Sequence, residues 1–127
     1  MEERIMARKQ KITTTLVVCL AAIGLVFSGP ICAKVEGDTI LFGAAVSFTG
    51  KYSTNGKHTK NGYDLAVERI NSKGGVKVGG KSYKIAIKYY DDESTPARGA
   101  QLAERLIKQD GIKFILGPYS SGMTKAV

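Results

Sequence analysis

Two adjacent serines, Ser120 and Ser121, are the residues of this sequence with the clearest capacity for chemistry. They follow a short apolar run at residues 114–116 and a Gly117-Pro118 turn. Serine is preferred at the start of a helix, where the first backbone N–H groups have no partner inside the helix. Those N–H groups and the helix dipole attract a carboxylate or a phosphate. The pattern predicts a buried strand, a turn and a helix start, whose serines either bind an anion or only cap the helix.

The acidic run Asp91-Asp92-Glu93 is the second group with a chemical interpretation. Paired carboxylates at the end of a strand can bind Mg²⁺, as in phosphate-handling α/β domains. An oxygen site needs more ligands than one loop supplies, so we favour a solvated loop that precedes a helix. We predict no metal and no cofactor.

The remaining polar and glycine motifs do not match a known catalytic pattern. His58 is the single histidine and has no Cys, Ser or acid pair around it in a catalytic order, so we expect it to face solvent on a helix. Gly74-Gly75 and Gly79-Gly80 lack the spacing of a dinucleotide or P-loop fingerprint. The sequence therefore favours a binding protein over an enzyme.

The elements that must position these residues alternate between strand and helix. Residues 40–47 are almost entirely apolar, which predicts a central strand covered on both faces. Helical spacing follows over residues 57–72 and ends at Gly74-Gly75. The apolar face of this predicted helix consists of Tyr63, Ala66, Val67 and Ile70.

A second strand, a second helix and a third strand follow. Residues 83–90 alternate between two faces, which indicates a half-exposed edge strand after a tight link at residues 76–82. Thr95 and Pro96 are a favoured N-cap and first residue for a helix over residues 96–110. The third strand is predicted at residues 112–116. The helix is expected to bury Ala100, Ala103, Leu106 and Ile107, with Leu102 at the border.

This alternation predicts an α/β fold with a partial doubly wound parallel sheet. If the second strand lies at the edge, the spatial order of the strands is second, first, third. Ligands of such sheets bind beyond the carboxyl ends of the strands. Three loops line that edge, at residues 48–56, 91–95 and 118–122, and the first and third are expected to face each other.

The N-terminal residues predict export. Residues 1–11 are rich in Lys and Arg, residues 12–27 carry no charge, and small residues precede Ala33. This is the pattern of a secretory signal peptide over residues 1–33, which leaves an exported domain over residues 34–127. The alternative is an uncleaved anchor, because the uncharged stretch has about the 20 residues that a bilayer span needs. Both cysteines, Cys19 and Cys32, fall in this leader, so no disulfide is expected in the mature chain.

The net charge of +8 at pH 7 does not indicate nucleic-acid binding. The basic residues are dispersed over predicted strands, turns and helix faces, without an Arg-rich run or interleaved aromatic residues. A solvated surface accounts for them.

Five stretches together resemble the type I periplasmic solute-binding proteins of branched-chain amino acid ABC transporters. They are Gly43-Ala-Ala-Val-Ser-Phe-Thr-Gly50, Asn61-Gly-Tyr-Asp-Leu-Ala66, Ile70-Asn-Ser-Lys-Gly-Gly75, Tyr89-Tyr-Asp-Asp92 and Gly117-Pro-Tyr-Ser-Ser121. The resemblance implies an extracytoplasmic protein that binds an amino acid between two lobes and delivers it to a membrane permease. Family members are longer, so we expect this chain to be the N-terminal part of lobe 1.

The resemblance also implies positions for the ligand site. Ser121 matches a serine that holds the α-carboxylate of the ligand, and Ser120 is the neighbouring candidate. Asn55 and Tyr52 match the loop after the first strand, and Tyr119 lies beside the serines. Leucine-type members commonly have an aromatic residue in place of Asn55, so this position departs from the family.

Two other functions stay open at this point. A ligand-sensing regulator or receptor domain would use the same lobe, and would be favoured by a leader retained as an anchor. An enzyme of the flavodoxin-like or receiver type would use Asp91 and Asp92.

Overall fold

The structure is a computed structural model and describes residues 33–127. The predicted signal peptide therefore lies, apart from Ala33, outside the described residues, as do Cys19 and Cys32. No helix within residues 33–127 is long and apolar enough to cross a membrane. In chain order the elements are β1 (Val35–Glu36), β2 (Thr39–Val46), α2 (Ser53–Ser72), β3 (Val76–Val78), β4 (Lys81–Asp91), α3 (Pro96–Lys108), β5 (Ile115–Leu116) and α4 (Ser121–Thr124).

The sheet is centred on β2, as the apolar run predicts. β2 pairs in parallel with β4 over the whole length of β2, from Thr39–Lys84 to Val46–Asp91. β5 pairs with β2 in parallel through Gly43–Ile115 and Ala44–Leu116. The predicted α/β class and the order second, first, third are confirmed. Two short antiparallel strands, β1 and β3, were not predicted.

β3 and the start of β4 form a hairpin where the sequence indicated only a tight link. Gly79 and Gly80 connect the strands, and both adopt positive φ, at 56° and 82°. Glycine adopts this conformation without steric cost, and it is the geometry of a two-residue hairpin turn. β3 covers β4 only over Lys81–Tyr83, so most of β4 is an edge strand as expected.

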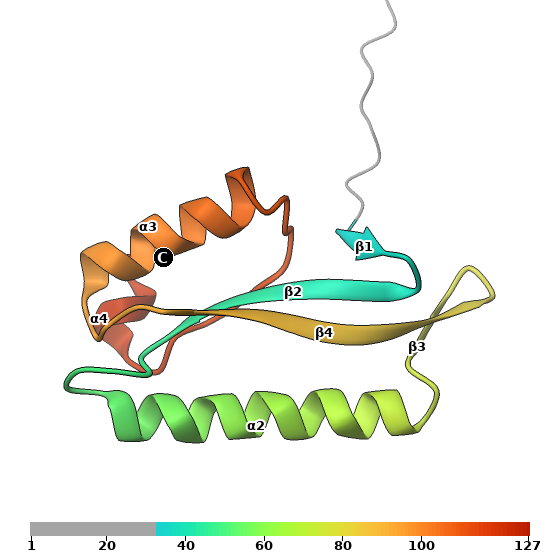
Figure 1. The fold of residues 1–127 in the computed structure, drawn as a ribbon, viewed down its shortest axis with the longest axis horizontal. Coiled ribbons are helices and arrows are strands. Elements are labelled where there is room, and N and C mark those ends of the chain that lie inside the picture. Colours follow the sequence, from blue (N-terminus) through green and yellow to red (C-terminus); the bar gives the residue numbers. More distant parts are fainter. Residues whose placement is uncertain (1–32) are drawn as a thin grey trace, which may run out of the picture. The chain divides into compact units, whose positions relative to one another are not determined.

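The helices cover opposite faces of the sheet. α2 runs along one face, and α3 and α4 lie on the other (Figure 1). The predicted faces of β4 are confirmed by side-chain contacts. The Tyr89 hydroxyl donates to Asp64 of α2 at 2.8 Å, whereas the Tyr90 hydroxyl donates at 2.9 Å to Asp110, which follows α3.

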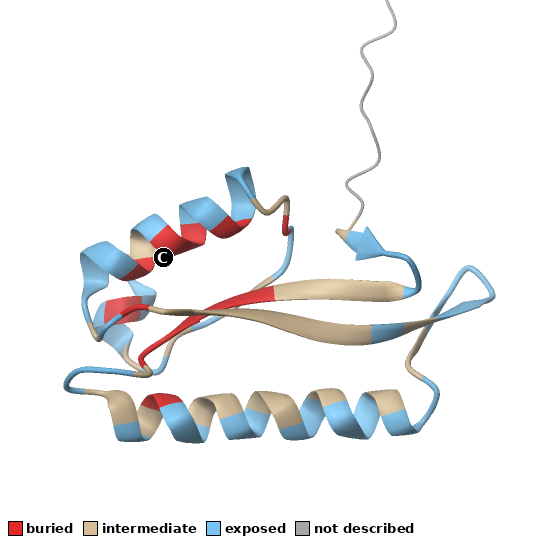
Figure 2. Cartoon of the chain, in the orientation of Figure 1, coloured by how far each residue is buried: buried red, intermediate tan, exposed pale blue. Residues whose placement is uncertain are grey.

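The buried core lies mainly between β2 and α3 (Figure 2). Leu106 is fully buried, and a Cβ added to Gly43 would lie 2.9 Å from its Cδ2. The glycine therefore lets the helix approach the central strand closely. The fully or nearly fully buried apolar residues are Ala44, Ala45, Val46, Leu102, Ala103, Leu106, Ile112 and Met123.

An apolar cavity of about 160 Å³ lies between α2 and the other face of the sheet. Four of its lining residues are the predicted apolar face of α2: Tyr63, Ala66, Val67 and Ile70. The sheet contributes Phe42, Ile85, Ile87 and Leu116. The predicted orientation of this helix is therefore confirmed.

Three details of burial differ from the predictions. Ile107 is 48% exposed and Leu102 is buried instead, so the apolar stripe of α3 is rotated toward Leu102. Phe114 is 47% exposed because β5 has only a two-residue pairing with β2 and no outer neighbour among residues 33–127. Ile112 is fully buried but precedes the strand, which begins at Ile115 and not at residue 112.

Asn71, at the end of α2, binds the free edge of β4 with its side-chain amide. Its Nδ2 donates to the Ile85 carbonyl at 2.8 Å, and its Oδ1 accepts the Ile85 N–H at 2.8 Å. The amide therefore takes the place of a neighbouring strand for one residue, which joins the helix to the sheet.

We expect Asn71→Asp to lower the free energy of unfolding by about 1–3 kcal/mol, the cost of leaving a backbone carbonyl without its donor. The measurement is urea unfolding of the two proteins, followed by circular dichroism. Asn61→Asp, on an exposed position of the same helix, is the matched control and should change stability by less than about 0.5 kcal/mol. Equal effects of the two substitutions would contradict the assigned contact.

Candidate functional site

Three loops meet at the carboxyl edge of the sheet, where a ligand of such a fold is expected to bind. They follow β2, β4 and β5, and they lead into α2, α3 and α4 (Figure 1). The site residues predicted from the sequence all belong to the first and third of these loops or to the helix starts after them.

Tyr52 and Tyr119 bring the first and third loops together. Their ring centroids lie 6.0 Å apart at an interplanar angle of 52°. Tyr119 is 50% exposed and Tyr52 is half-buried, so the pair forms a partly open aromatic surface. The prediction that these loops face each other is confirmed.

The two serines have different positions at the start of α4. Ser120 is the N-cap, and its Oγ accepts the Met123 N–H at 3.2 Å. Ser121 is the first residue of the helix and is exposed. Ser120 thus has the capping role that the sequence left open for both, whereas Ser121 is accessible to a ligand.

The turn before α4 is held by the neighbouring helix. The Tyr63 hydroxyl of α2 donates to the Gly117 carbonyl at 2.7 Å. On the other side of α4, Met123 is buried, and its Cε would lie 3.2 Å from a Cβ added to Gly99 of α3. α4 therefore packs against α3, while the turn that precedes it is hydrogen-bonded to α2.

Asn55 lies in the first turn of α2, which corrects the predicted loop over residues 48–56. The helix begins at Ser53, and Asn55 is half-buried, with its carbonyl accepting the Thr59 hydroxyl at 3.0 Å. The turn-forming residues Ser53, Thr54 and Gly56 are helical because this turn packs against the end of β2. His58 is exposed on the same helix, as predicted.

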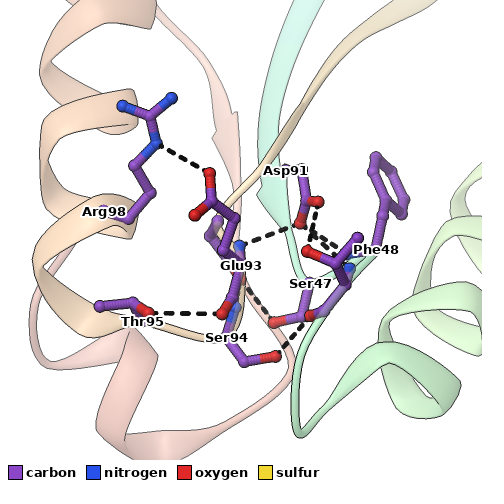
Figure 3. Close-up of polar contacts among 9 residues, drawn as sticks. Ser47, Phe48, Asp91, Glu93, Ser94, Thr95 and Arg98 are labelled. Carbon is purple, nitrogen blue, oxygen red and sulfur yellow. Dashed lines mark hydrogen bonds and ion pairs between the residues drawn. The ribbon is translucent and has the colours of Figure 1, made fainter.

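The acidic run that begins at Asp91, the last residue of β4, organises the first loop (Figure 3). Asp91 Oδ1 accepts the Phe48 N–H at 2.9 Å, and Asp91 Oδ2 accepts the Thr49 hydroxyl at 2.7 Å. Burial alone would raise the pKa of Asp91, but the N–H of Glu93, the Thr49 hydroxyl and the N–H of Phe48 outweigh it. The pKa of this carboxyl is therefore lowered, and the charged carboxylate accepts hydrogen bonds that hold the loop.

Asp92 is fully buried beside the end of β2. Its Oδ1 accepts the Ser47 hydroxyl at 2.6 Å and the Ser94 N–H at 2.8 Å. Its Oδ2 has no hydrogen-bond partner within residues 33–127. The buried side chain thus links Ser47, which follows β2, to Ser94 in the loop after β4.

The acidic run does not form a metal cluster. Glu93 lies 3.6 Å from Arg98 Nε, and the oxygens of Asp91 accept backbone and side-chain donors (Figure 3). Over the described range 33–127, no three His, Cys, Asp or Glu side chains are grouped so that they could hold a metal ion.

Ser94 is the site residue that sequence reasoning missed. Its Oγ accepts the Tyr52 N–H at 2.9 Å and donates to the Thr49 carbonyl at 2.7 Å. The sequence showed only a polar exit loop. These partners are 42 and 45 positions away, and no local pattern reports a contact over that separation.

A family model described as "Periplasmic binding protein" matches residues 39–127, which include every element from β2 to α4. This chain belongs to the periplasmic binding protein family. The match includes all three loops of the candidate site and confirms the resemblance stated on the sequence motifs.

Individual relatives of this periplasmic binding protein agree with the family model. The Leu/Ile/Val-binding protein BraC3 of Rhizobium johnstonii is 32% identical over 112 residues, which cover 88% of this chain and 26% of the relative. LivJ of Streptococcus pneumoniae, a branched-chain amino acid transporter substrate-binding protein solved with isoleucine, has a TM-score of 0.61 and 32% identity. That alignment covers 69% of this chain and 24% of LivJ.

A third relative was solved with a different ligand. A solute-binding protein of an ABC transporter from Rhodopseudomonas palustris, in complex with 3,4-dihydroxybenzoic acid, has a TM-score of 0.56 and 31% identity. Its alignment covers 70% of this chain and 23% of that protein. The chain therefore spans about a quarter of the length of the relatives it matches.

Proposed function

We propose that this chain is part of the first lobe of a periplasmic solute receptor that binds an amino acid or a similar small carboxylate. The receptor is not an enzyme, and it delivers its ligand to the membrane permease of an ABC transporter. The observation that carries the proposal is the meeting of Tyr52 and Tyr119 beside the exposed Ser121, within the segment that matches the family.

The chemistry of this edge suits a carboxylate. The Ser121 hydroxyl and the first N–H groups of α4 supply donors, and the helix start supplies a partial positive charge. Asn55 and the tyrosine rings would contact the rest of the ligand. Isoleucine and 3,4-dihydroxybenzoic acid, the ligands named for two relatives, differ in shape but share a carboxyl group. We infer that the carboxylate is the common feature and that Asn55 helps to select the remainder.

Export to the periplasm is part of the same proposal. A receptor of this family meets its ligand outside the cytoplasmic membrane, and the pattern of residues 1–33 is that of a secretory signal peptide. Sequencing of the N-terminus of the exported protein should show a new terminus at Lys34. An intact leader would instead favour the sensor alternative.

The proposed function can be tested by placing residues 34–127 in the frame of BraC3, in exchange for the segment they match. We expect isothermal titration calorimetry of this chimera to detect leucine, valine or benzoate at micromolar concentrations. The isolated chain, which carries one wall of the cleft, should bind these compounds only weakly. A folded chimera that binds none of these carboxylates, while BraC3 itself binds leucine, would contradict the proposal.

Replacing Ser121 by alanine in this chimera should weaken carboxylate binding by about 1.5–3 kcal/mol, the range for a hydrogen bond to a charged group. Ser120→Ala is the matched control. Because Ser120 caps α4, its loss should lower stability by about 1 kcal/mol and affect binding less directly. If the control weakens binding as much as Ser121→Ala does, the hydroxyl of Ser121 is not the carboxylate ligand.

A further inference from the structure

Several hydrogen bonds join the end of β4 and the loop after it to the loop after β2. Asp91 accepts the backbone N–H groups of Phe48 and Thr49 (Figure 3). Ser94 binds the backbone on both sides of Gly50, through the Thr49 carbonyl and the Tyr52 N–H. Gly50 lies so close that an added Cβ would be 2.7 Å from the Glu93 carbonyl. The two loops therefore behave as one unit.

The backbone of this unit is strained in the loop after β4. Glu93 and Ser94 are consecutive non-glycine residues with positive φ, at 54° and 60°. Such conformations are unfavourable and persist only where surrounding contacts enforce them. Here the carboxylates enforce them, because Asp91 accepts the Glu93 N–H at 2.9 Å and Asp92 accepts the Ser94 N–H at 2.8 Å.

The strained backbone places the Ser94 hydroxyl at the start of α2. That hydroxyl accepts the N–H of Tyr52, the N-cap residue of the helix, and the Tyr52 ring lies 6.0 Å from the Tyr119 ring. Ser94 binds the backbone of Tyr52 and not its ring. Ser94 can therefore determine the position of the ring without contacting a ligand itself. Asn55 follows in the first turn of the same helix.

We propose that Ser94, held by Asp91 and Asp92, is a positioning residue that fixes Tyr52 against Tyr119 and so sets the shape of the ligand site. The inference rests on the proposed function for the identity of the site, whereas the loop geometry can be tested independently. It also assigns the acidic run a task in place of metal binding. The run holds one strained serine in the orientation that the first loop requires.

The decisive comparison is between three variants of the full 127-residue chain. Ser94→Ala removes the hydroxyl and keeps the strain, and Ser94→Gly removes the hydroxyl and relieves the strain. Glu93→Gly, the matched control, relieves similar strain at the neighbouring residue and keeps the hydroxyl. The Glu93 side chain is exposed and pairs only with Arg98 in the described part of the chain.

The readouts are nuclear Overhauser contacts between the Tyr52 and Tyr119 rings and the exchange rate of the Tyr52 amide hydrogen. We expect both Ser94 variants to lose the ring contacts and to exchange about two- to tenfold faster, the range for loss of one net hydrogen bond. Glu93→Gly should keep both signals. Ser94→Gly should melt at a higher temperature than Ser94→Ala without recovering the ring contacts, a separation that a purely structural role does not produce.

Either of two results would overturn the proposal. The first is a Ser94→Gly protein that keeps the ring contacts and the slow exchange, which would show that the hydroxyl is dispensable. The second is a Glu93→Gly protein that loses them as fully, which would assign the effect to the backbone alone. Should Ser94→Ala fail to fold, Ser94→Gly and Glu93→Gly still decide the question.

A ligand measurement keeps this inference separate from the proposed function. In the BraC3 chimera, Ser94→Gly should change the ratio of leucine to benzoate affinity, because the Tyr52 ring moves, whereas Glu93→Gly should leave that ratio unchanged. A parent chimera that binds no carboxylate would defeat the proposed function, and the outcome of the loop measurements would stand by itself.

Discussion

Gly56→Ala is expected to lower the free energy of unfolding by at least about 3 kcal/mol, because the new methyl group has no space. A Cβ at Gly56 would lie 1.8 Å from the Ser47 carbonyl oxygen and 2.6 Å from its carbon. Both atoms belong to the backbone, so no side-chain rotation can relieve the overlap. The first turn of α2 would have to leave the end of β2, and it would carry Tyr52 and Asn55 with it.

The matched control for this substitution lies on the same helix. Gly62 has no heavy atom within 4 Å of an added Cβ. Gly62→Ala should therefore raise the free energy of unfolding by about 0.5–1 kcal/mol through helix propensity. Urea unfolding followed by circular dichroism measures both changes. If Gly56→Ala proved as harmless as Gly62→Ala, the close approach of α2 to β2 would be wrong.

Leu106→Ala should lower the free energy of unfolding by about 3–5 kcal/mol, the range for a leucine removed from a packed core. Leu106 is fully buried between α3 and the central strand, in contact range of Gly43. The substitution creates a cavity, because the surrounding structure relaxes only in part. Thermal and urea unfolding of the two proteins provide the measurement.

Two further variants check this second prediction. Ile107→Ala, at a residue 48% exposed on the same helix, should cost less than about 1 kcal/mol. Gly43→Ala should lower the free energy of unfolding less in the Leu106→Ala protein than in the original protein. The reason is that its methyl group would enter the space that the Leu106 side chain leaves. We expect a coupling of about 0.5–3 kcal/mol in this double-mutant cycle. Additive effects would show that Gly43 and Leu106 do not share a packing site.

Both predictions concern the supports of the candidate site and not its ligand groups. Gly56 lets α2 begin against β2, and Leu106 holds α3 against the same strand. The loops that carry Tyr52 and Ser94 extend from these elements. A loss of either support should therefore reduce ligand binding by the chimera even though neither residue would touch a ligand.

The elements with a clear period were predictable from the sequence. The apolar run of β2, the alternation of β4 and the helical spacing of α2 each report a local geometry and a buried face. The start of a helix near Ser120 and Ser121 and the helix stop at Gly74 were equally local, since both depend on residues within a few positions. Strand order followed from these elements, and it brought Tyr52 and Tyr119 together.

Burial at the margins of the apolar core was not predictable in this way. Ile107 and Phe114 carry apolar side chains at positions that fit a buried face, yet each is about half exposed. Exposure depends on which neighbours complete a layer, and a residue's own type does not contain that information. The start of α2 at Ser53 has the same cause, because close packing on Ser47 overrides the turn preference of Gly56.

Residue order along the chain determined the α/β class, the placement of β2 at the centre, the family and the serines at the start of α4. Only the tertiary structure decided that Asp91, Asp92 and Ser94 hold the loop of Tyr52, and that Ser120 caps while Ser121 stays exposed. The physical reason is the sequence separation over which each kind of interaction acts. Periodicity and capping act over one or two turns, whereas the hydrogen bonds between the two loops join residues more than 40 positions apart. Such contacts exist only after parallel pairing has aligned the ends of β2 and β4.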